Sequence, residues 1–399
     1  MTTHAMPNAL LHQPRPQDLI KTSMRPGARL KLNSHNEWDE LREVIVGSVE
    51  RQACLAFTSS RPVSEEMYRK IAAFACEAFP QRLLDEANED VESLCALLRK
   101  SGVNVLRPDT SDVGKPYATC LWSAGGDRMY NMRDLHLVVG NTVLECASQE
   151  RHRFLEATGL YEIWSGYFKQ GCRWIAAPRP RLAGQYLTTH DDGGQRYQTL
   201  TEDEILFEAA NILRVGKDLL YLVSRSGNYL GAKWIQSVLG DEYRVHTTEI
   251  YRSSHIDSTI LCLRPGLVLL NASRVSERNC PKIFDKWDKI YFSDIAPTPV
   301  ETLELHEHTR TRIHKELAHV GISTDIAHLA SDWIGMNLLS LDPQTVIVDE
   351  RQIDLIKTLQ RYKIMPIPVS FRHSHLLKGG IHCSTLDTVR ASTLENYCD

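Results

Sequence analysis

The 399-residue sequence lacks several features that would assign it to a common class of protein. None of its hydrophobic runs reaches the ~18 residues that a membrane-spanning helix needs. Neither a GxGxxG motif nor a P-loop occurs, which argues against chemistry that depends on a bound nucleotide. Basic residues (46) and acidic residues (50) nearly balance, so no strong positive field points to nucleic acid. We therefore expect neither a membrane nor a nucleic acid as partner.

The ten cysteines are scattered and form no CxxC pair. Structural zinc sites usually contain closely paired cysteines, so we expect no such site. Most of the thiols are expected to be reduced and buried, as in a cytoplasmic protein. One of them is a candidate nucleophile.

Composition and the lack of a linker predict one large domain after an N-terminal tail. Hydrophobic residues make up 42% and charged residues 24% of the chain, as in globular proteins with a large core. Residues 1–29 carry four basic residues, but four prolines interrupt any amphipathic helix there. We interpret them as a flexible tail on a cytoplasmic protein, with a cleaved organellar presequence as the alternative. No Ser/Gly/Pro-rich linker divides residues 30–399, which are expected to form one closed domain.

Paired hydrophobic runs joined by turn signals recur along the chain. The turns are Gly140-Asn141, Gly216-Lys217, Pro265-Gly266 and Asp342-Pro343. They predict four β-hairpins, because these residue types supply turn dihedrals between β-rich arms. The predicted strand pairs are 135–139 with 143–147, 205–213 with 219–223, 259–263 with 267–270, and 338–341 with 346–348.

Helical spacing and a further extended run follow the hairpins. Helices are predicted over 149–167, 228–239 and 354–362, and extended runs over 244–250 and 363–371. Near the N-terminus, a strand over 41–49 is predicted to be followed by a helix over 64–100 and a strand over 103–107. Residues 190–194 are predicted to be a polar loop. The strand–strand–helix–strand unit recurs about every 50–70 residues, a period typical of propeller-like closure. An ordinary α/β sheet with coincidental hairpin spacing is the alternative.

Unusual polar residues stand at or near the first strand of each unit. They are Arg133-Asp134, Glu208, His255-Ile256-Asp257, Ser331-Asp332-Trp333 and, in the last unit, Gly379-Gly380-Ile381-His382-Cys383. If the units pack around one axis, these residues converge on a single pocket.

Such a pocket suits attack of sulfur on a guanidinium carbon. A cysteine becomes a thiolate beside a base or a cation, and a histidine oriented by a carboxylate relays protons at neutral pH. Two further carboxylates match the N–H donors of a guanidinium group. Taken singly, Cys383 could be an inert core thiol, Asp134 the ion-pair partner of Arg133, Glu208 an exposed edge residue, and residues 379–380 a turn. Their shared placement favours the catalytic interpretation.

At these residues the sequence resembles the amidinotransferase family, typified by glycine amidinotransferase and the inosamine and cyanobacterial-toxin amidinotransferases. The resemblance rests on residues 33–41, Arg133-Asp134, Tyr229-Leu230-Gly231, residues 243–246, His255-Ile256-Asp257, Trp333 with Met336-Asn337, and residues 379–383. It implies a transferase with a pentein-like α/β fold, a fivefold pseudosymmetric propeller of ββαβ modules.

The resemblance also implies a role for each site residue. Cys383 matches the nucleophile, His255 the general acid/base, Glu208 the residue that orients the histidine, Asp134 and Asp257 the guanidinium ligands, and Arg274 and Ser331 the residues that bind the carboxylate end of the donor. Two positions depart from the family pattern. Glu208 replaces the usual aspartate, and Arg252-Ser253-Ser254 replaces the Asn-Pro-Met of glycine-using members. We therefore do not expect glycine as acceptor. We expect Arg252 at the entrance to the acceptor site, where its positive charge suits an amine that carries an acidic group.

The implied reaction is a ping-pong transfer of the amidino group from L-arginine to an amine acceptor, with release of L-ornithine. It needs neither a metal nor a cofactor, and it suits secondary metabolism. Two alternatives stay open: a guanidine-group hydrolase similar to arginine deiminase, and a non-catalytic relative that only binds arginine. The sequence also leaves a homodimer open.

Overall fold

The computed structural model describes residues 30–49, 80–112, 115–125, 129–183, 186–192, 195–319 and 329–398. Internal contacts divide the chain after Leu30, and the helices and strands below all belong to the unit Lys31–Asp399. The predicted tail, 1–29, and part of the predicted helix, 64–79, lie outside the described residues. Within the described ranges, no helix combines the length and the hydrophobicity needed to cross a bilayer.

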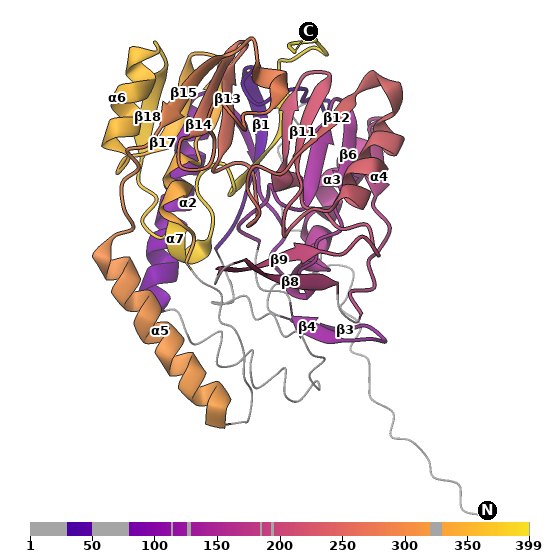
Figure 1. Ribbon diagram of the computed structural model, residues 1–399, viewed down its shortest axis with the longest axis vertical. Coiled ribbons are helices and arrows are strands. Elements are labelled where there is room, and N and C mark those ends of the chain that lie inside the picture. The colour runs from indigo at the N-terminus through magenta and orange to yellow at the C-terminus, as the bar shows by residue number, and fades with distance from the viewer. Residues whose placement is uncertain are drawn as a thin grey trace, which may run out of the picture. The chain divides into compact units, whose positions relative to one another are not determined.

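Five three-stranded sheets in the described residues share one topology (Figure 1). In each, an antiparallel hairpin is followed by a strand parallel to the second hairpin strand. The sheets are β5 (His136–Val139), β6 (Thr142–Glu145) and β7 (Arg173–Ala176); β10 (Ile212–Val215), β11 (Asp218–Leu222) and β12 (Arg244–Thr248); β13 (Ile260–Arg264), β14 (Leu267–Asn271) and β15 (Asp288–Phe292); β16 (Leu339–Asp342), β17 (Thr345–Asp349) and β18 (Met365–Val369); and β19 (Thr385–Arg390), β1 (Leu41–Val46) and β2 (Asn104–Leu106). The last sheet draws β19 from the C-terminal part and β1 and β2 from the N-terminal part, so this pairing joins distant ends of the unit.

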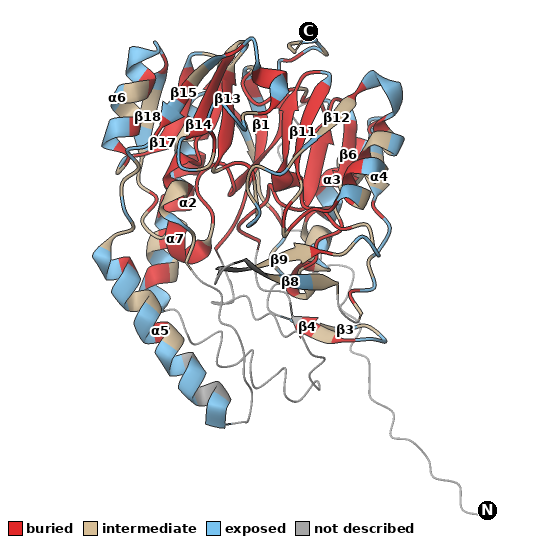
Figure 2. Cartoon of the chain, viewed as in Figure 1, coloured by how far each residue is buried: buried red, intermediate tan, exposed pale blue. Residues whose placement is uncertain are grey.

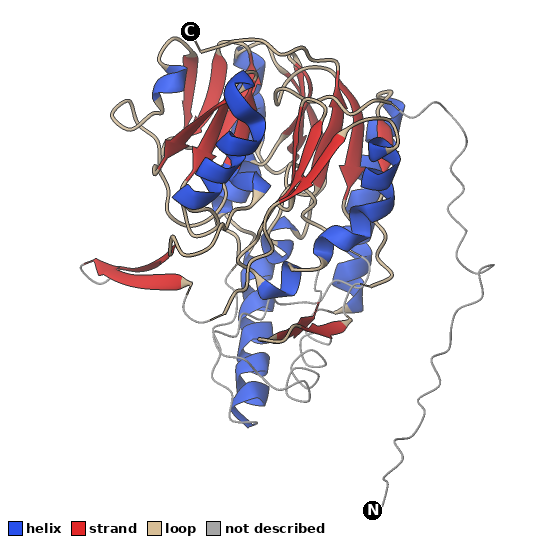
Figure 3. Cartoon of the chain, turned by 90° about the vertical axis from the view of Figure 1, so that its right-hand side faces the viewer, coloured by secondary structure: helices blue, strands red, loops and turns tan. Residues whose placement is uncertain are grey.

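The connection from second to third strand is helical in every one of these sheets, because parallel neighbours need a crossover. The crossover helices are α2 (Gln81–Lys100), α3 (Tyr161–Phe168) after two 3₁₀ turns, α4 (Tyr229–Leu239), a 3₁₀ turn (Lys282–Phe284) and α6 (Ile353–Arg361). Figure 1 shows α4 and α6 at the outer edges of the strands, and Figure 3 shows helices (blue) beside the strands (red). The other elements are α5 (Val300–His319), α7 (Ser374–Leu377), and the hairpins β3 (Pro116–Ala118) with β4 (Ser123–Gly125) and β8 (Leu187–Asp192) with β9 (Gln195–Leu200).

The hairpin strands form where hydrophobic residues run without a polar alternation. Every residue of β5, β10, β14 and β17 is buried. Strands β14 and β17 are labelled among the red strands of Figure 2. A strand covered on both faces reads as a continuous hydrophobic run. The tight turns between these strands use glycine where the backbone is left-handed: φ is +54° at Gly140 and +76° at Gly266.

Hydrophobic clusters join each three-stranded sheet to the next. The pairs that share a cluster are Ile45 with Val138, Leu144 with Leu219, Leu220 with Val268, Leu269 with Val346, and Ile347 with Val44. The series starts at the sheet that contains β1 and returns to it. Each sheet therefore has a packed neighbour on both sides.

The structure confirms three of the predicted hairpins to within a few residues and corrects the fourth. The first strand of the second hairpin begins at Ile212 rather than at residue 205, because Phe207 makes only an isolated bridge and 209–211 form a 3₁₀ turn. Residues 149–167 are two 3₁₀ turns and a short helix rather than one helix. Of the predicted polar loop at 190–194, residues 190–192 belong to strand β8, and 193–194 lie outside the described residues. Strands β8 and β9 lack the hydrophobic alternation that marks most strands.

Candidate active site

Most of the predicted site residues lie in loops directly before the first strand of a sheet. Asp134 and Cys383 each lie two residues before a first strand, β5 and β19 respectively. Asp257 lies three residues before β13, and Glu208 four before β10. The repeated topology thus places chemically active side chains at equivalent positions of different sheets.

Hydrogen bonds link these loops in a closed series. The donors and acceptors are Arg133 N–H to the Cys383 carbonyl (3.3 Å), Ala209 N–H to the Asp134 carbonyl (2.6 Å), Ile256 N–H to the Ala210 carbonyl (3.0 Å), Asn337 Nδ2 to the Asp257 carbonyl (3.4 Å), and His382 N–H to the Asn337 carbonyl (3.2 Å). Five loops from five sheets are therefore held side by side. Asn337 also accepts a hydrogen bond from the main-chain N–H of Cys383 (2.8 Å), which fixes the peptide of the candidate nucleophile.

His255 lies between two buried carboxylates. Its Nε2 is 2.5 Å from Glu208 Oε2, and its Nδ1 is 3.7 Å from Asp134 Oδ1. Burial alone would lower the pKa of His255, but the charge of Asp134 and the hydrogen bond and charge of Glu208 raise it to about 9. The imidazole therefore carries a proton at neutral pH.

Glu208 makes the contact predicted for it despite its extra methylene group. Burial alone would raise the pKa of its carboxyl group, but the hydrogen bond and charge of His255 lower that pKa to about 2. Its second oxygen accepts a hydrogen bond from Ser148 Oγ (2.5 Å). Both oxygens are thus held, and Glu208 is fixed in the ionised form.

Asp134 is only partly satisfied by its surroundings. One oxygen, Oδ2, accepts a hydrogen bond from the Arg153 guanidinium, which also pairs with Glu156 (2.6 Å). The other oxygen, Oδ1, is buried and has no hydrogen-bond partner within the described ranges. A buried acceptor without a donor is unfavourable, so this oxygen is suited to receive a donor from a bound ligand.

Cys383 is 2% exposed, and its Sγ–H donates to Asp257 Oδ2 at 3.1 Å. Burial and the charges of Asp257 and Asp134 raise the pKa of the thiol well above its ordinary value. The same carboxylate oxygen accepts from His382 Nδ1 at 3.0 Å. Burial alone would raise the pKa of Asp257, but the hydrogen bond and charge of His382 and the charge of His255 lower it. The thiol thus keeps its proton beside ionised acids until a cation offsets their charge.

Arg274 and Ser331 also contact one another. Arg274 Nη2 donates to Ser331 Oγ (3.2 Å), and Nη1 donates to Thr259 Oγ1 (2.8 Å). The guanidinium carbon of Arg274 lies 3.7 Å from the centre of the Tyr251 ring, a cation–π contact. Arg274 is thereby held in one orientation close to the loop that carries Asp257.

Arg252 is exposed, and its guanidinium carbon lies 4.9 Å from the centre of the Tyr197 ring in β9. The β8–β9 hairpin thus meets the loop that carries His255. The sequence pattern predicts a loop over part of this hairpin and gives no signal that Tyr197 is a neighbour of the site.

Two residues that sequence reasoning missed, Ser148 and Arg153, hold predicted residues in place. Two others, Asn337 and His382, stand in the sequence motifs without a predicted role, and they hold Cys383 and Asp257. For Asn337 the sequence offers a positional signal. Asn337 lies two residues before β16, as Asp134 and Cys383 do before their strands, whereas the predicted Ser331 lies farther from that strand. The adjacent glycines are also explained: a Cβ on Gly379 would lie 1.9 Å from Asn131 Oδ1. The glycine pair allows close packing rather than only a turn.

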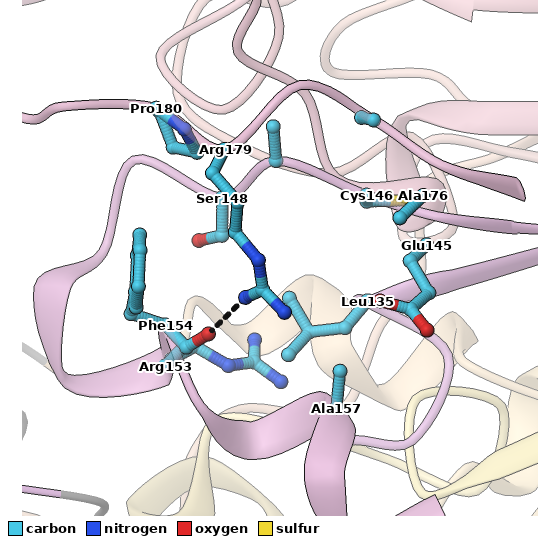
Figure 4. Close-up of a pocket in the computed structure, with 12 residues that line it drawn as sticks. Leu135, Glu145, Cys146, Ser148, Arg153, Phe154, Ala157, Ala176, Arg179 and Pro180 are labelled. Carbon is cyan, nitrogen blue, oxygen red and sulfur yellow. Dashed lines mark hydrogen bonds between the residues drawn. The ribbon is translucent and has the colours of Figure 1, made fainter. Parts of the chain in front are cut away.

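A cavity is lined in part by Ser148 and Arg153, the residues that support Glu208 and Asp134 (Figure 4). Within it, Arg179 donates to the Phe154 carbonyl (3.1 Å). Asp134, Glu208 and His255 also present ligand atoms within 4.8 Å of one another, a spacing that suits a metal ion. A cation there would have to displace the hydrogen bond between His255 and Glu208, because that bond occupies two of the ligand atoms.

Comparison with known proteins adds the family to this geometry. No model of a protein family matches the chain. An inosamine-phosphate amidinotransferase of Streptomyces glaucescens is 41% identical over 369 residues, which cover 91% of this chain and 98% of that protein. An L-arginine:L-lysine amidinotransferase of Pseudomonas savastanoi pv. phaseolicola is 31% identical over 375 residues, covering 91% and 96% of the two chains.

Solved structures agree with these relatives. An inosamine-phosphate amidinotransferase from Streptomyces griseus superposes with a TM-score of 0.77 at 37% identity, over 93% of this chain and all of the other. A dimethylarginine dimethylaminohydrolase from Pseudomonas aeruginosa has a TM-score of 0.52 at 13% identity, over 87% of this chain and 99% of the other. The second likeness shows a shared α/β fold and nothing about activity.

Proposed function

The chain belongs to the amidinotransferase family, and we propose that it moves the amidino group of L-arginine to an amine acceptor through a covalent intermediate on Cys383. The family is a family of transferases. One observation supports the assignment of the donor site: Oδ1 of Asp134 is buried 3.7 Å from His255 Nδ1 and, among the residues that the structure describes, has no hydrogen-bond donor. A guanidinium N–H group is the kind of donor that this oxygen lacks.

The donor is held at two ends. Asp134 and Asp257 bind the guanidinium, and Arg274 with Ser331 binds the carboxylate of arginine. The Tyr251 ring and Thr259 keep Arg274 in place. The positive charge of the bound guanidinium offsets the two acids that raise the pKa of the Cys383 thiol. The thiol therefore releases its proton to solvent when arginine binds, and the sulfur becomes a thiolate.

The first half-reaction forms a carbon–sulfur bond and breaks a carbon–nitrogen bond. The thiolate attacks the guanidinium carbon, and the electron pair of the breaking bond leaves with the amine nitrogen. His255, protonated at neutral pH, gives its proton to that nitrogen, and ornithine departs. An amidino group stays on the sulfur, and Glu208 stabilises the imidazolium from which the proton came.

The second half-reaction reverses these roles. An amine acceptor attacks the amidino carbon and loses a proton to the neutral His255. The carbon–sulfur bond breaks, and its electron pair returns to Cys383 as a thiolate. The amidino product then leaves, and the site is ready for another arginine.

We further propose that the acceptor carries an anionic group, which Arg252 binds. Arg252 lies three residues before His255 in the chain. Its guanidinium is exposed and stacks on the ring of Tyr197. The relatives' names give an inosamine phosphate and L-lysine as substrates, and both are amines with an anionic group. The substituted loop Arg252-Ser253-Ser254 supports an acceptor other than glycine. The names of the inosamine-phosphate relatives support a role in secondary metabolism.

The fold that brings the site together is, we propose, a fivefold propeller. Its support is the closed series of hydrophobic clusters, in which each three-stranded sheet packs against two others. The hydrogen bonds between the five site loops follow the same order. Closure is completed by the pairing of β19 with β1.

Incubation with L-arginine, with and without amines, tests this function. We expect ornithine in the presence of an acceptor amine, in amounts equal to the new guanidino product, and none from Cys383→Ala. Steady release of citrulline that does not depend on an amine would instead favour a hydrolase. Binding of arginine without either product would favour a non-catalytic relative.

Arg252→Gln tests the proposed role of Arg252 in acceptor binding. The substitution should raise the KM of an anionic acceptor and leave the KM of a neutral amine unchanged. Equal effects on the two KM values would refute the role of Arg252.

A further inference from the structure

His382, the residue before the proposed nucleophile, is held between two carboxylates. Its Nδ1 lies 3.0 Å from Asp257 Oδ2 and its Nε2 lies 3.6 Å from Glu37 Oε2. Its main chain is fixed as well, because its N–H donates to the Asn337 carbonyl (3.2 Å) and its carbonyl accepts from Arg133 Nε (3.0 Å). The side chain is 8% exposed. The ring therefore has one orientation, which aims Nδ1 at Asp257.

Glu37, which faces the other nitrogen, belongs to a buried network of charges. Arg214 Nη2 lies 2.8 Å from Glu37 Oε2 and 2.7 Å from Asp387 Oδ2. Asp387 also pairs with Arg133 (2.7 Å) and Arg390 (2.8 Å). Burial alone would raise the pKa of Glu37, but Arg214 and His382 lower it. Glu37 thus stays ionised, and the network fixes the side of His382 that faces away from the site.

Asp257 needs a fixed partner when the chemistry begins. Its Oδ2 accepts from two donors, the Cys383 thiol at 3.1 Å and His382 Nδ1 at 3.0 Å. When the thiol becomes a thiolate, its donor is lost, and two negative charges face one another across the same distance. They repel, so the carboxylate would rotate away unless a second donor held it. Within the described ranges, His382 Nδ1 is that second donor.

We propose that His382 is a positioning residue that holds Oδ2 of Asp257 while Cys383 is a thiolate, and so leaves Oδ1 directed at the donor guanidinium. This inference rests on the proposed function, because it assumes that a guanidinium binds Asp257. It assigns the two nitrogens different tasks. Nδ1 holds Asp257, and Nε2 connects the ring to the buried network through Glu37.

Two substitutions separate these tasks. His382→Asn keeps an N–H donor near the place of Nδ1, whereas His382→Gln carries its amide near the place of Nε2. We expect His382→Gln to raise the KM for arginine about tenfold or more, the effect of one lost hydrogen bond to a charged group. His382→Asn should stay within about threefold of the parent protein, because the bond to Asp257 is kept.

Direct binding gives a readout that does not need turnover. In a Cys383→Ala background, where residue 383 no longer donates to Asp257, calorimetry with L-arginine should show the same order, with weaker binding for the Gln variant than for the Asn variant. His246→Asn and His246→Gln are matched controls, since His246 lies on β12 and contacts Asp218 on β11 (2.6 Å) rather than a residue of the site loops. Neither control should change the KM for arginine.

The outcomes are distinct. If both His382 variants weaken arginine binding equally, or if neither does, the positioning role is wrong. If the parent protein neither binds arginine nor releases ornithine, the proposed function itself has failed instead. Should His382→Gln not fold, His382→Ala compared with His382→Asn gives the same contrast, because alanine removes the donor without demanding space. Equal binding by these two variants would again overturn the role.

Discussion

Replacement of Glu208 by glutamine is predicted to shift the pH dependence of ornithine release. The substitution keeps the shape of the side chain and removes its charge. In the parent protein burial alone would lower the pKa of His255, while Asp134 and Glu208 raise it to about 9. Asp134 remains in the variant, so only part of this rise is lost. One pKa unit corresponds to about 1.4 kcal/mol, and we expect the pKa of His255 to fall by about one to two units.

The assay is release of ornithine in the first half-reaction, followed over a range of pH in the presence of saturating arginine. His255 must be protonated to give its proton to the departing amine, so the rate falls as the pH rises through its pKa. In the parent protein this fall should occur near pH 9. In Glu208→Gln it should occur about one to two units lower. The maximal rate should fall as well, since amide and imidazole no longer form an ion pair.

Glu202→Gln is the matched control, because Glu202 accepts hydrogen bonds from the N–H groups of Tyr229 (3.1 Å) and Leu230 (2.8 Å) rather than from His255. Its profile should match that of the parent protein. A basic limb that stays near pH 9 in Glu208→Gln would refute the assignment of that limb to the pair of His255 and Glu208. A shift to higher pH would contradict the electrostatic reasoning outright.

Three further predictions concern stability. Arg153→Met leaves Asp134 and Glu156 as buried charges without their shared partner, and should lower the free energy of unfolding by about 3–5 kcal/mol in urea denaturation. Arg82→Ala, which removes an exposed arginine, should leave the free energy of unfolding unchanged, and equal effects of the two substitutions would be evidence against the buried ion pair. Gly379→Ala should cost about 1–3 kcal/mol, because its Cβ would lie 1.9 Å from Asn131 Oδ1, and a stability equal to that of the parent would show that this packing is looser than described. Folding raises the pKa of His255 from 6.5 to about 9, so protonation of His255 contributes about 3 kcal/mol to the free energy of unfolding below pH 6.5, and this contribution is lost as the pH rises through about 9. Denaturation midpoints of the parent and of His255→Asn should therefore converge at high pH, and a constant difference between them would contradict this linkage.

Local patterns predicted the hairpins well because both of their strands are buried. In β13 and β14 an uninterrupted hydrophobic run, a two-residue turn and a second run left little choice of structure. The β8–β9 hairpin is different, because its strands are polar and its pairing is not marked by alternation. Helix α5 was also missed, since polar residues dominate its sequence and few of its side chains are buried.

The site residues were predictable to the extent that they recur at the start of each unit. Asp134, Glu208, Asp257 and Cys383 were selected by that rule, and their contacts with one another or with His255 follow it. Arg153 could not be selected, because only the folded chain brings its guanidinium to Asp134. The partner of a buried charge is a property of the packing and is not written in the residues next to it.

Mass spectrometry of the protein after brief exposure to L-arginine, without an acceptor, shows whether Cys383 carries the amidino group. We expect a peptide containing Cys383 whose thiol hydrogen is replaced by one amidino group, and the disappearance of that group when an acceptor amine is added. Unmodified Cys383 under conditions that release ornithine, or an amidino group on another residue, would contradict it.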